Sequence, residues 1–125
     1  MRQTAGDFKY ENGYDIPINV LAEKISELAQ QYSQHIYMRP LCVVSLLFTI
    51  DDEKRPQLYK LDPAGYYIGY KATATGEKEQ AATGNLEKAF KKNPSLSQAD
   101  TIKTAIKVLQ DVIITNKTNI IIIKF

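Results

Sequence analysis

The sequence is poor in the residues that build disulfides, metal centres and catalytic dyads. Its 125 residues include one cysteine, Cys42, one histidine, His35, and no tryptophan. A single cysteine excludes an internal disulfide, and one cysteine with one histidine cannot supply the ligand set of a zinc site. We therefore expect no metal site. We also expect no cofactor and no catalytic residue, because no motif places a serine or cysteine nucleophile near His35. We interpret His35 as a structural or surface histidine and Cys42 as a buried, inert thiol within an apolar strand.

The sequence also lacks a dominant charge and long apolar runs. Sixteen Lys and Arg against 14 Asp and Glu leave a net charge of +2, with the two signs interleaved. This balance gives no electrostatic reason to expect binding to nucleic acid or to a membrane. No apolar run approaches the roughly 20 residues that span a bilayer, and residues 1–10 contain no apolar signal core. We expect a cytoplasmic or nuclear protein.

The composition that remains is that of a globular domain, with 44% hydrophobic and 24% charged residues. The length suits one domain with its own core. Near the C-terminus, residues 119–125 contain four successive isoleucines, a strand that would promote aggregation unless it paired inside a sheet. Both ends are abrupt. We expect residues 1–125 to be a single partial domain from a longer chain.

The most explicit local signal is the segment Asp62-Pro63-Ala64-Gly65. Pro63 presets φ for the first corner of a type I turn, and the Asp62 side chain can accept hydrogen bonds from the turn's backbone. Gly65 can adopt the left-handed conformation that closes the turn. These four residues predict a structural hairpin joining two strands, residues 57–61 and 66–74.

The other elements follow from apolar periodicity and from breakers. Residues 41–50 are almost continuously apolar and predict a strand covered on both faces. A short helix should end near Gly13, and further helices are expected over residues 77–92 and 97–113, where Ser97 and Asp100 resemble a capping box. A helix over residues 16–35 is predicted by an apolar stripe: Ile18, Leu21, Ala22, Ile25, Leu28, Ala29 and Tyr32. The last helix has its own stripe: Ile102, Ala105, Ile106, Leu109, Val112 and Ile113.

Three polar or aromatic clusters permit a functional reading besides a structural one. Residues 51–53 (Asp-Asp-Glu) lack the ligand spacing of a calcium loop, and we interpret residues 51–56 as a solvated turn. Lys88, Lys91 and Lys92 can offset the dipole at a helix C-terminus. Four tyrosines in or beside the hairpin could be cross-strand packing pairs or anchors at a protein interface: Tyr59, Tyr66, Tyr67 and Tyr70.

Several segments in order resemble the alpha-type subunits of the 20S proteasome. They are Met-Arg-Pro-Leu at 38–41, Pro-Gln-Leu-Tyr at 56–59, Asp-Pro-Ala-Gly-Tyr-Tyr at 62–67 and Lys-Ala-Thr-Ala-Thr-Gly at 71–76. The resemblance covers residues 2–92 well and the remainder loosely. One departure is Cys42, where the family commonly has glycine.

The resemblance implies an α+β fold, a truncated portion of the four-layer αββα sandwich of N-terminal-nucleophile hydrolases. It also implies that roughly the first half of the subunit and its extreme C-terminus are missing. It implies a non-catalytic subunit for alpha-ring assembly, gating scaffold and activator docking in ubiquitin-dependent protein degradation. The implied partners are neighbouring alpha subunits, beta-ring subunits and regulatory activators, and the isolated fragment is expected to self-associate.

Two alternatives to the alpha-ring hypothesis stay open. A catalytic beta subunit shares the fold, but beta subunits tend to carry a Gly-Ser-rich segment after the hairpin, where this chain has residues 71–76. The other alternative is a free RNA- or ligand-binding module that uses the tyrosine-rich hairpin. Residues 65–70 resemble the aromatic strand of an RNA-recognition motif, but Ala64 stands where that motif has a basic residue and Tyr67 where it has a small one.

Overall fold

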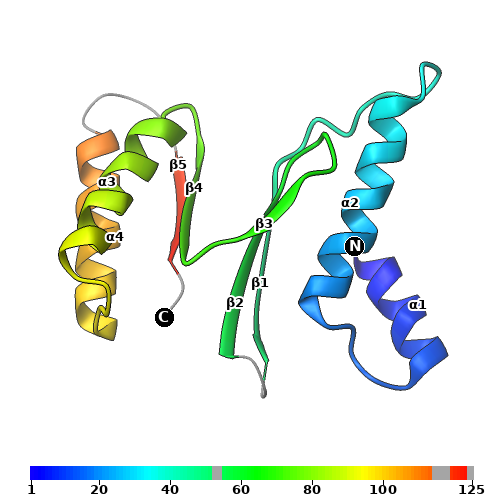
Figure 1. Ribbon diagram of the computed structural model, residues 1–125, viewed down its shortest axis with the longest axis horizontal. Coiled ribbons are helices and arrows are strands. Elements are labelled where there is room, and N and C mark those ends of the chain that lie inside the picture. Colours follow the sequence, from blue (N-terminus) through cyan, green and yellow to red (C-terminus); the bar gives the residue numbers. More distant parts are fainter. Residues whose placement is uncertain (52–54, 114–118, 124–125) are drawn as a thin grey trace. The chain divides into compact units, whose positions relative to one another are not determined.

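The computed structural model describes residues 1–51, 55–113 and 119–123. The chain divides into two compact units, Met1–Tyr70 and Lys71–Phe125, and each combines helices with an antiparallel sheet (Figure 1). The predicted mixture of helices and antiparallel strands is therefore observed. The expectation of a single partial domain over residues 1–125 stays a prediction.

The helices of the first unit lie where the sequence predicts them. Helix α1, Arg2–Asn12, ends at Gly13, whose φ of 79° is left-handed and whose N–H donates to the Lys9 carbonyl at 2.8 Å. This confirms the predicted glycine C-cap. Helix α2, Ile18–Gln34, begins directly after Pro17. A proline fits there because the first N–H groups of a helix have no intrahelical acceptor.

Three antiparallel strands form the sheet of the first unit, in the order β1-β2-β3. Strand β1 is Ser45–Asp51, β2 is Arg55–Leu61 and β3 is Tyr67–Gly69. Leu47 pairs with Tyr59, and Leu61 pairs with Tyr67. Alternate residues of a strand share one face, so these side chains meet helix α2 together. The resulting apolar cluster consists of Ala22, Ile25 and Leu61, with Leu21, Leu47, Tyr59 and Tyr67 packed against it.

The expectation of a strand over residues 41–50, covered on both faces, is wrong in two respects. The strand begins only at Ser45, and Cys42 has a φ of 52°, a left-handed conformation that cannot belong to an extended strand. Within β1, the side chains of Phe48 and Ile50 are 72% and 81% exposed. Only one face of this strand is covered, because α2 packs against the face that carries Leu47.

The expected strand over residues 66–74 is also interrupted. The Tyr70 N–H donates to the Leu58 carbonyl at 2.8 Å and ends the pairing with β2. The chain then enters a second sheet as β4, Ala72–Gly76, which pairs antiparallel with β5, Asn119–Ile123. The isoleucine strand is therefore paired, as its composition predicts. The expected loop over residues 51–56 is shorter than predicted, because Asp51 belongs to β1 and residues 55–56 belong to β2. Its residues 52–54, the turn residues 116–118 and the last residues 124–125 lie outside the described ranges.

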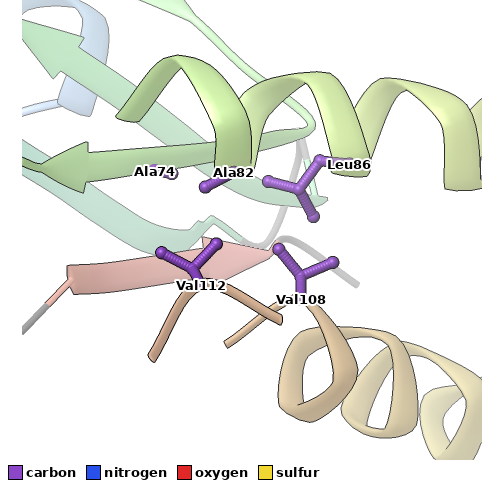
Figure 2. Close-up of a cluster of buried hydrophobic side chains, with 5 residues drawn as sticks. All are labelled: Ala74, Ala82, Leu86, Val108 and Val112. Carbon is purple, nitrogen blue, oxygen red and sulfur yellow. The ribbon is translucent and has the colours of Figure 1, made fainter. Parts of the chain in front are cut away.

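The second unit is held together by one apolar cluster between its helices and its sheet. Helix α3 is Glu79–Lys92 and helix α4 is Gln98–Ile113. Figure 2 shows the side chains of these two helices pointing toward one another beside β4. The buried members are Ala74, Ala82, Leu86, Val108 and Val112. Their burial stabilises the unit, since each large apolar side chain contributes on the order of 1.5–3 kcal/mol.

Helix α4 has the predicted cap but buries only part of the predicted apolar stripe, including Val112. Ser97 Oγ accepts from the Asp100 N–H at 3.4 Å and donates to Asp100 Oδ2 at 2.8 Å, so the acid bonds the hydroxyl and not the Ser97 N–H. The buried positions include Thr101, whose hydroxyl donates to the Ser97 carbonyl at 2.9 Å. Ile102 and Ile106, expected in the core, are about half exposed. The apolar stripe is wider than the surface that its neighbours α3 and β5 offer.

Candidate functional site

The predicted hairpin turn is present and is closed by its backbone. The Gly65 N–H donates to the Asp62 carbonyl at 3.0 Å, and the Asp62 N–H donates to the Tyr66 carbonyl at 2.8 Å. Gly65 has a φ of 90°, as the left-handed closing position requires. Among the described residues no hydrogen bond reaches the Asp62 carboxylate, so the expected side-chain contribution to the turn is not observed. The turn joins β2 to β3, with Leu61 paired to Tyr67.

Two serine hydroxyls of helix α2 form hydrogen bonds to the turn and hold it against the helix. Ser26 Oγ donates to the Gly65 carbonyl, and Ser33 Oγ lies 2.8 Å from the Pro63 carbonyl and 3.0 Å from the Ala29 carbonyl. Ser26 and Ser33 are seven residues apart, which places them on one face of the helix, two turns from each other. Ser26 is only 6% exposed, and its hydrogen bond compensates for burying a hydroxyl.

Gly65 is required at this contact for a second reason besides its φ. A Cβ atom at position 65 would lie 2.7 Å from the Gln30 Cβ and 2.9 Å from the Ser26 carbonyl oxygen. Both distances are shorter than real Cβ contacts, so a side chain here would force the turn away from α2. The glycine is therefore fixed by the packing of the hairpin on the helix as well as by the turn itself.

The sequence did not identify the two serines. Ser26 interrupts the apolar face of α2, and a buried serine is not predicted by apolar periodicity. The only available signal was the seven-residue spacing of Ser26 and Ser33 on a helix expected to pack against a hairpin. The acceptors for these hydroxyls are backbone carbonyls of the turn, and their positions are set by the tertiary fold.

The four tyrosines of the hairpin divide into two pairs. Tyr59 and Tyr67 pack against the α2 cluster, with ring centroids 6.4 Å apart and planes tilted by 45°. Tyr66 and Tyr70 are exposed, with 58% and 38% of their surface accessible. Both interpretations from the sequence therefore apply, but to different residues: one pair forms the core, and the other is available to a partner.

The side chains of His35 and Cys42 both lie on the surface. His35 follows α2 directly, and its ring lies 5.4 Å from that of Tyr37. Cys42 is exposed, so its expected burial is wrong. The described ranges contain no group of three His, Cys, Asp or Glu side chains that could hold a metal ion. Within them, no helix has both the length and the apolar character to cross a membrane.

A groove of about 300 Å³ with charged and apolar lining residues lies between α3 and α4 in the second unit. Lys88 and Lys92 line it from α3, and Lys107 and Asp111 line it from α4. Lys92 is in the last turn of α3, where a cation offsets the helix dipole as the sequence predicts. Lys107 lies within α4 and has no such explanation.

Comparison with known proteins matches this chain to one protein family. The family model described as "Proteasome subunit" matches residues 1–123. The "Probable proteasome subunit alpha type-1" of Schizosaccharomyces pombe is 46% identical over 116 residues, which is 92% of this chain and 48% of that protein. The "Proteasome subunit alpha type-6" of Caenorhabditis elegans is 45% identical over 106 residues, 85% of this chain and 43% of that protein.

A more distant relative is the "Proteasome subunit alpha" of Aeropyrum pernix, which is 32% identical over 97 residues, 78% of this chain and 37% of that protein. The segment at 13–17 and the pair Tyr66-Tyr67 predict a likeness to the alpha type-6 (iota) class, and the type-6 relative confirms it. The match also confirms the predicted α+β fold class of the N-terminal-nucleophile hydrolase type. The chain spans about half or less of the length of these relatives.

Proposed function

The chain belongs to the proteasome subunit family, and on that premise we propose that it is part of a non-catalytic alpha-type subunit that builds the alpha ring of a 20S core particle. The observation that carries this proposal is the identity of 46% and 45% with two alpha-type subunits across most of the chain. The function is structural: the helices and the hairpin hold surfaces for neighbouring subunits. Through the ring the protein takes part in ubiquitin-dependent protein degradation.

The partners are neighbouring alpha subunits, beta-ring subunits and the regulatory particle or other activators that dock on the ring. Two exposed tyrosines of the hairpin, Tyr66 and Tyr70, support a role in protein contacts, because tyrosine is enriched at interfaces. Tyr59 and Tyr67 are committed to packing. Only half of the tyrosine cluster is therefore free to stack on bases, and the structure does not favour the RNA-binding alternative.

The alpha-type assignment also distinguishes this chain from a catalytic beta subunit. Residues 71–76, Lys-Ala-Thr-Ala-Thr-Gly, stand where beta subunits tend to have a Gly-Ser-rich segment, and residues 72–76 form strand β4, which pairs with β5. The curated relatives described above are all alpha-type by name. Because the alpha ring has no nucleophile to supply, the protein contributes to proteolysis by assembly.

The experiment that tests the proposal is co-purification of the full-length protein that carries this sequence. With an affinity tag, it should bring down both alpha-type and beta-type subunits in one large complex. The complex should hydrolyse fluorogenic peptides, whereas the tagged subunit alone should not. Recovery of the protein outside any such complex would contradict the proposal, and peptidase activity of the subunit alone would indicate a beta-type function.

Location in the cytoplasm and the nucleus follows from the same proposal, because the alpha ring acts where ubiquitin-tagged proteins are degraded. Fluorescence microscopy of the tagged full-length protein tests it. Fluorescence confined to a membrane-bound organelle other than the nucleus would contradict it.

The isolated chain should associate with a second copy of itself through strand β1. This strand lies at an edge of its sheet, and its outer face carries Phe48 and Ile50, the two most exposed apolar side chains of the strand. An edge strand presents unpaired backbone N–H and C=O groups, and two identical edges can pair antiparallel about a twofold axis. In that pairing Phe48 and Ile50 would lie beside their copies as cross-strand neighbours, which covers part of their exposed surface.

A further inference from the structure

The groove between α3 and α4 is lined by three lysines, more than the dipole of α3 accounts for. Lys88 and Lys92 are four residues apart and therefore share one face of α3. Lys107 lines the same groove from α4, four residues before Asp111. The dipole of α3 accounts for cations in its last turn, which contains Lys91 and Lys92, but not for a lysine within α4.

These three ammonium groups are not neutralised within the described part of the chain. No ion pair within the described residues involves Lys88, Lys92 or Lys107; the pairs Lys9–Asp15 and Lys103–Asp100, for example, lie elsewhere. Asp111 is the one carboxylate among the described lining residues. The groove therefore holds a net charge of two positive units, three lysines less one aspartate, in a volume of about 300 Å³.

The lining also has an apolar part. Val108 is buried at the base of the groove, where it belongs to the core cluster, and the half-buried Leu96 lies on the connection between the helices. A groove with an apolar base and a charged rim is typical of a surface that accepts one apolar side chain with polar groups around it.

This combination favours a protein ligand over a nucleic acid. Proteins that bind single strands stack bases on aromatic side chains, and the described lining contains none. The carboxylate of Asp111 would repel a phosphate backbone that followed the groove. An acidic peptide can bind beside Asp111, because its carboxylates are separated by uncharged groups and need not lie close to that side chain.

We propose that the groove between α3 and α4 binds an acidic protein segment, whose carboxylates contact Lys88, Lys92 and Lys107 and whose apolar side chain rests on Leu96 and Val108. The proposal goes beyond assembly of the alpha ring and does not depend on it. The occupant is identified by charge complementarity and by the apolar base, and these properties suit a short segment rich in aspartate and glutamate with a leucine among them.

The test is binding of a fluorescein-labelled ten-residue glutamate peptide with two central leucines, measured by fluorescence anisotropy at physiological salt. Surface charges more than a Debye length apart are largely screened there, so distant lysines contribute little. Lys92→Gln and Lys107→Gln should each weaken binding roughly two- to fivefold, and the double variant about tenfold. Replacement of the two leucines of the peptide by glycine should weaken binding as well.

The chain offers matched controls on the same two helices. Lys91 precedes Lys92 in the last turn of α3, and Lys103 lies one turn before Lys107 on α4, but neither lines the groove. Lys91→Gln and Lys103→Gln should leave the affinity unchanged. Equal losses in control and groove variants would overturn the proposal in favour of non-specific attraction. A Kd weaker than about 1 mM would also overturn it. So would tighter, lysine-dependent binding of single-stranded oligothymidine, which would indicate nucleic acid.

Discussion

The contact between the hairpin turn and α2 makes a quantitative prediction for the substitution Gly65→Ala. The added methyl group has two separate costs. It places a Cβ atom on a residue with a φ of 90°, and it brings that atom 2.7 Å from the Gln30 Cβ and 2.9 Å from the Ser26 carbonyl oxygen. Gly13→Ala separates these costs, because Gly13 has a φ of 79° and nothing within 4 Å of its added Cβ.

The expected loss of stability follows from these two costs, the left-handed φ and the overlap with α2. A left-handed conformation costs an L-residue roughly 1–2 kcal/mol, and alanine recovers about 0.4–1 kcal/mol by restricting the unfolded chain. Gly13→Ala should therefore destabilise by about 1 kcal/mol. Gly65→Ala adds the overlap with α2, which separates the turn from Ser26 and Ser33. Losing two hydrogen bonds and leaving the buried Ser26 hydroxyl without a partner costs on the order of 2–3 kcal/mol more.

The assay can report on the first unit alone. All eight tyrosines of the chain lie within Met1–Tyr70, and the chain has no tryptophan. Intrinsic tyrosine fluorescence during urea unfolding therefore follows this unit without a signal from the second one. The free energy of unfolding is obtained by linear extrapolation for the wild type and for both alanine variants. The predicted difference between Gly65→Ala and Gly13→Ala is about 2–3 kcal/mol.

One result would refute this reasoning. If the two alanine variants lost stability equally, within about 0.5 kcal/mol, the close approach of the turn to α2 would have no energetic consequence. The role of Gly65 would then be confined to the conformation of the turn. A Gly65→Ala variant that is fully unfolded in buffer would agree with the prediction, provided that Gly13→Ala folds.

The remaining predictions concern three other positions. Cys42→Gly should stabilise the chain by about 0.5–1 kcal/mol in urea unfolding, because it relieves a φ of 52°, whereas Cys42→Ala should give no gain. Ser26→Ala should cost about 1–2 kcal/mol because it leaves the Gly65 carbonyl unpaired, and the more exposed Ser33→Ala should cost less; the reverse order would contradict the assigned roles. Ile50→Lys should shift the isolated chain toward monomer in solution scattering, and an unchanged radius of gyration would exclude β1 as the contact.

Much of the secondary structure could be predicted because its signals are local. Gly13 ends α1, and Pro17 precedes α2, since each residue restricts its own backbone. The turn at residues 62–65 is correct for the same reason. Two strand predictions were wrong because each extended a strand through residues whose backbone leaves the strand conformation or the sheet. Cys42 has a positive φ, and the chain changes sheets between Gly69 and Ala72, neither of which apolar composition reveals.

The side chains around the candidate sites were less predictable than the elements that carry them. Ser26 and Ser33 were missed because the turn carbonyls that accept from them lie 39 and 30 residues away in the chain, respectively. The burial of α4 was misplaced because a helical stripe shows which side of a helix is apolar but not how much of that side its neighbours cover. Ile102 and Ile106 are half exposed for this reason.

By itself, the sequence determined the helices α1 to α4, the turn at Asp62–Gly65 and the resemblance to alpha-type proteasome subunits, because each depends on residues close together in the chain. Only the tertiary structure decided that the turn presses on α2 through Ser26 and that Gly65 has no room for a side chain. It also brought Lys107 to the same groove as Lys88 and Lys92. These features depend on backbone and side-chain groups distant in sequence, whose separation is set by packing.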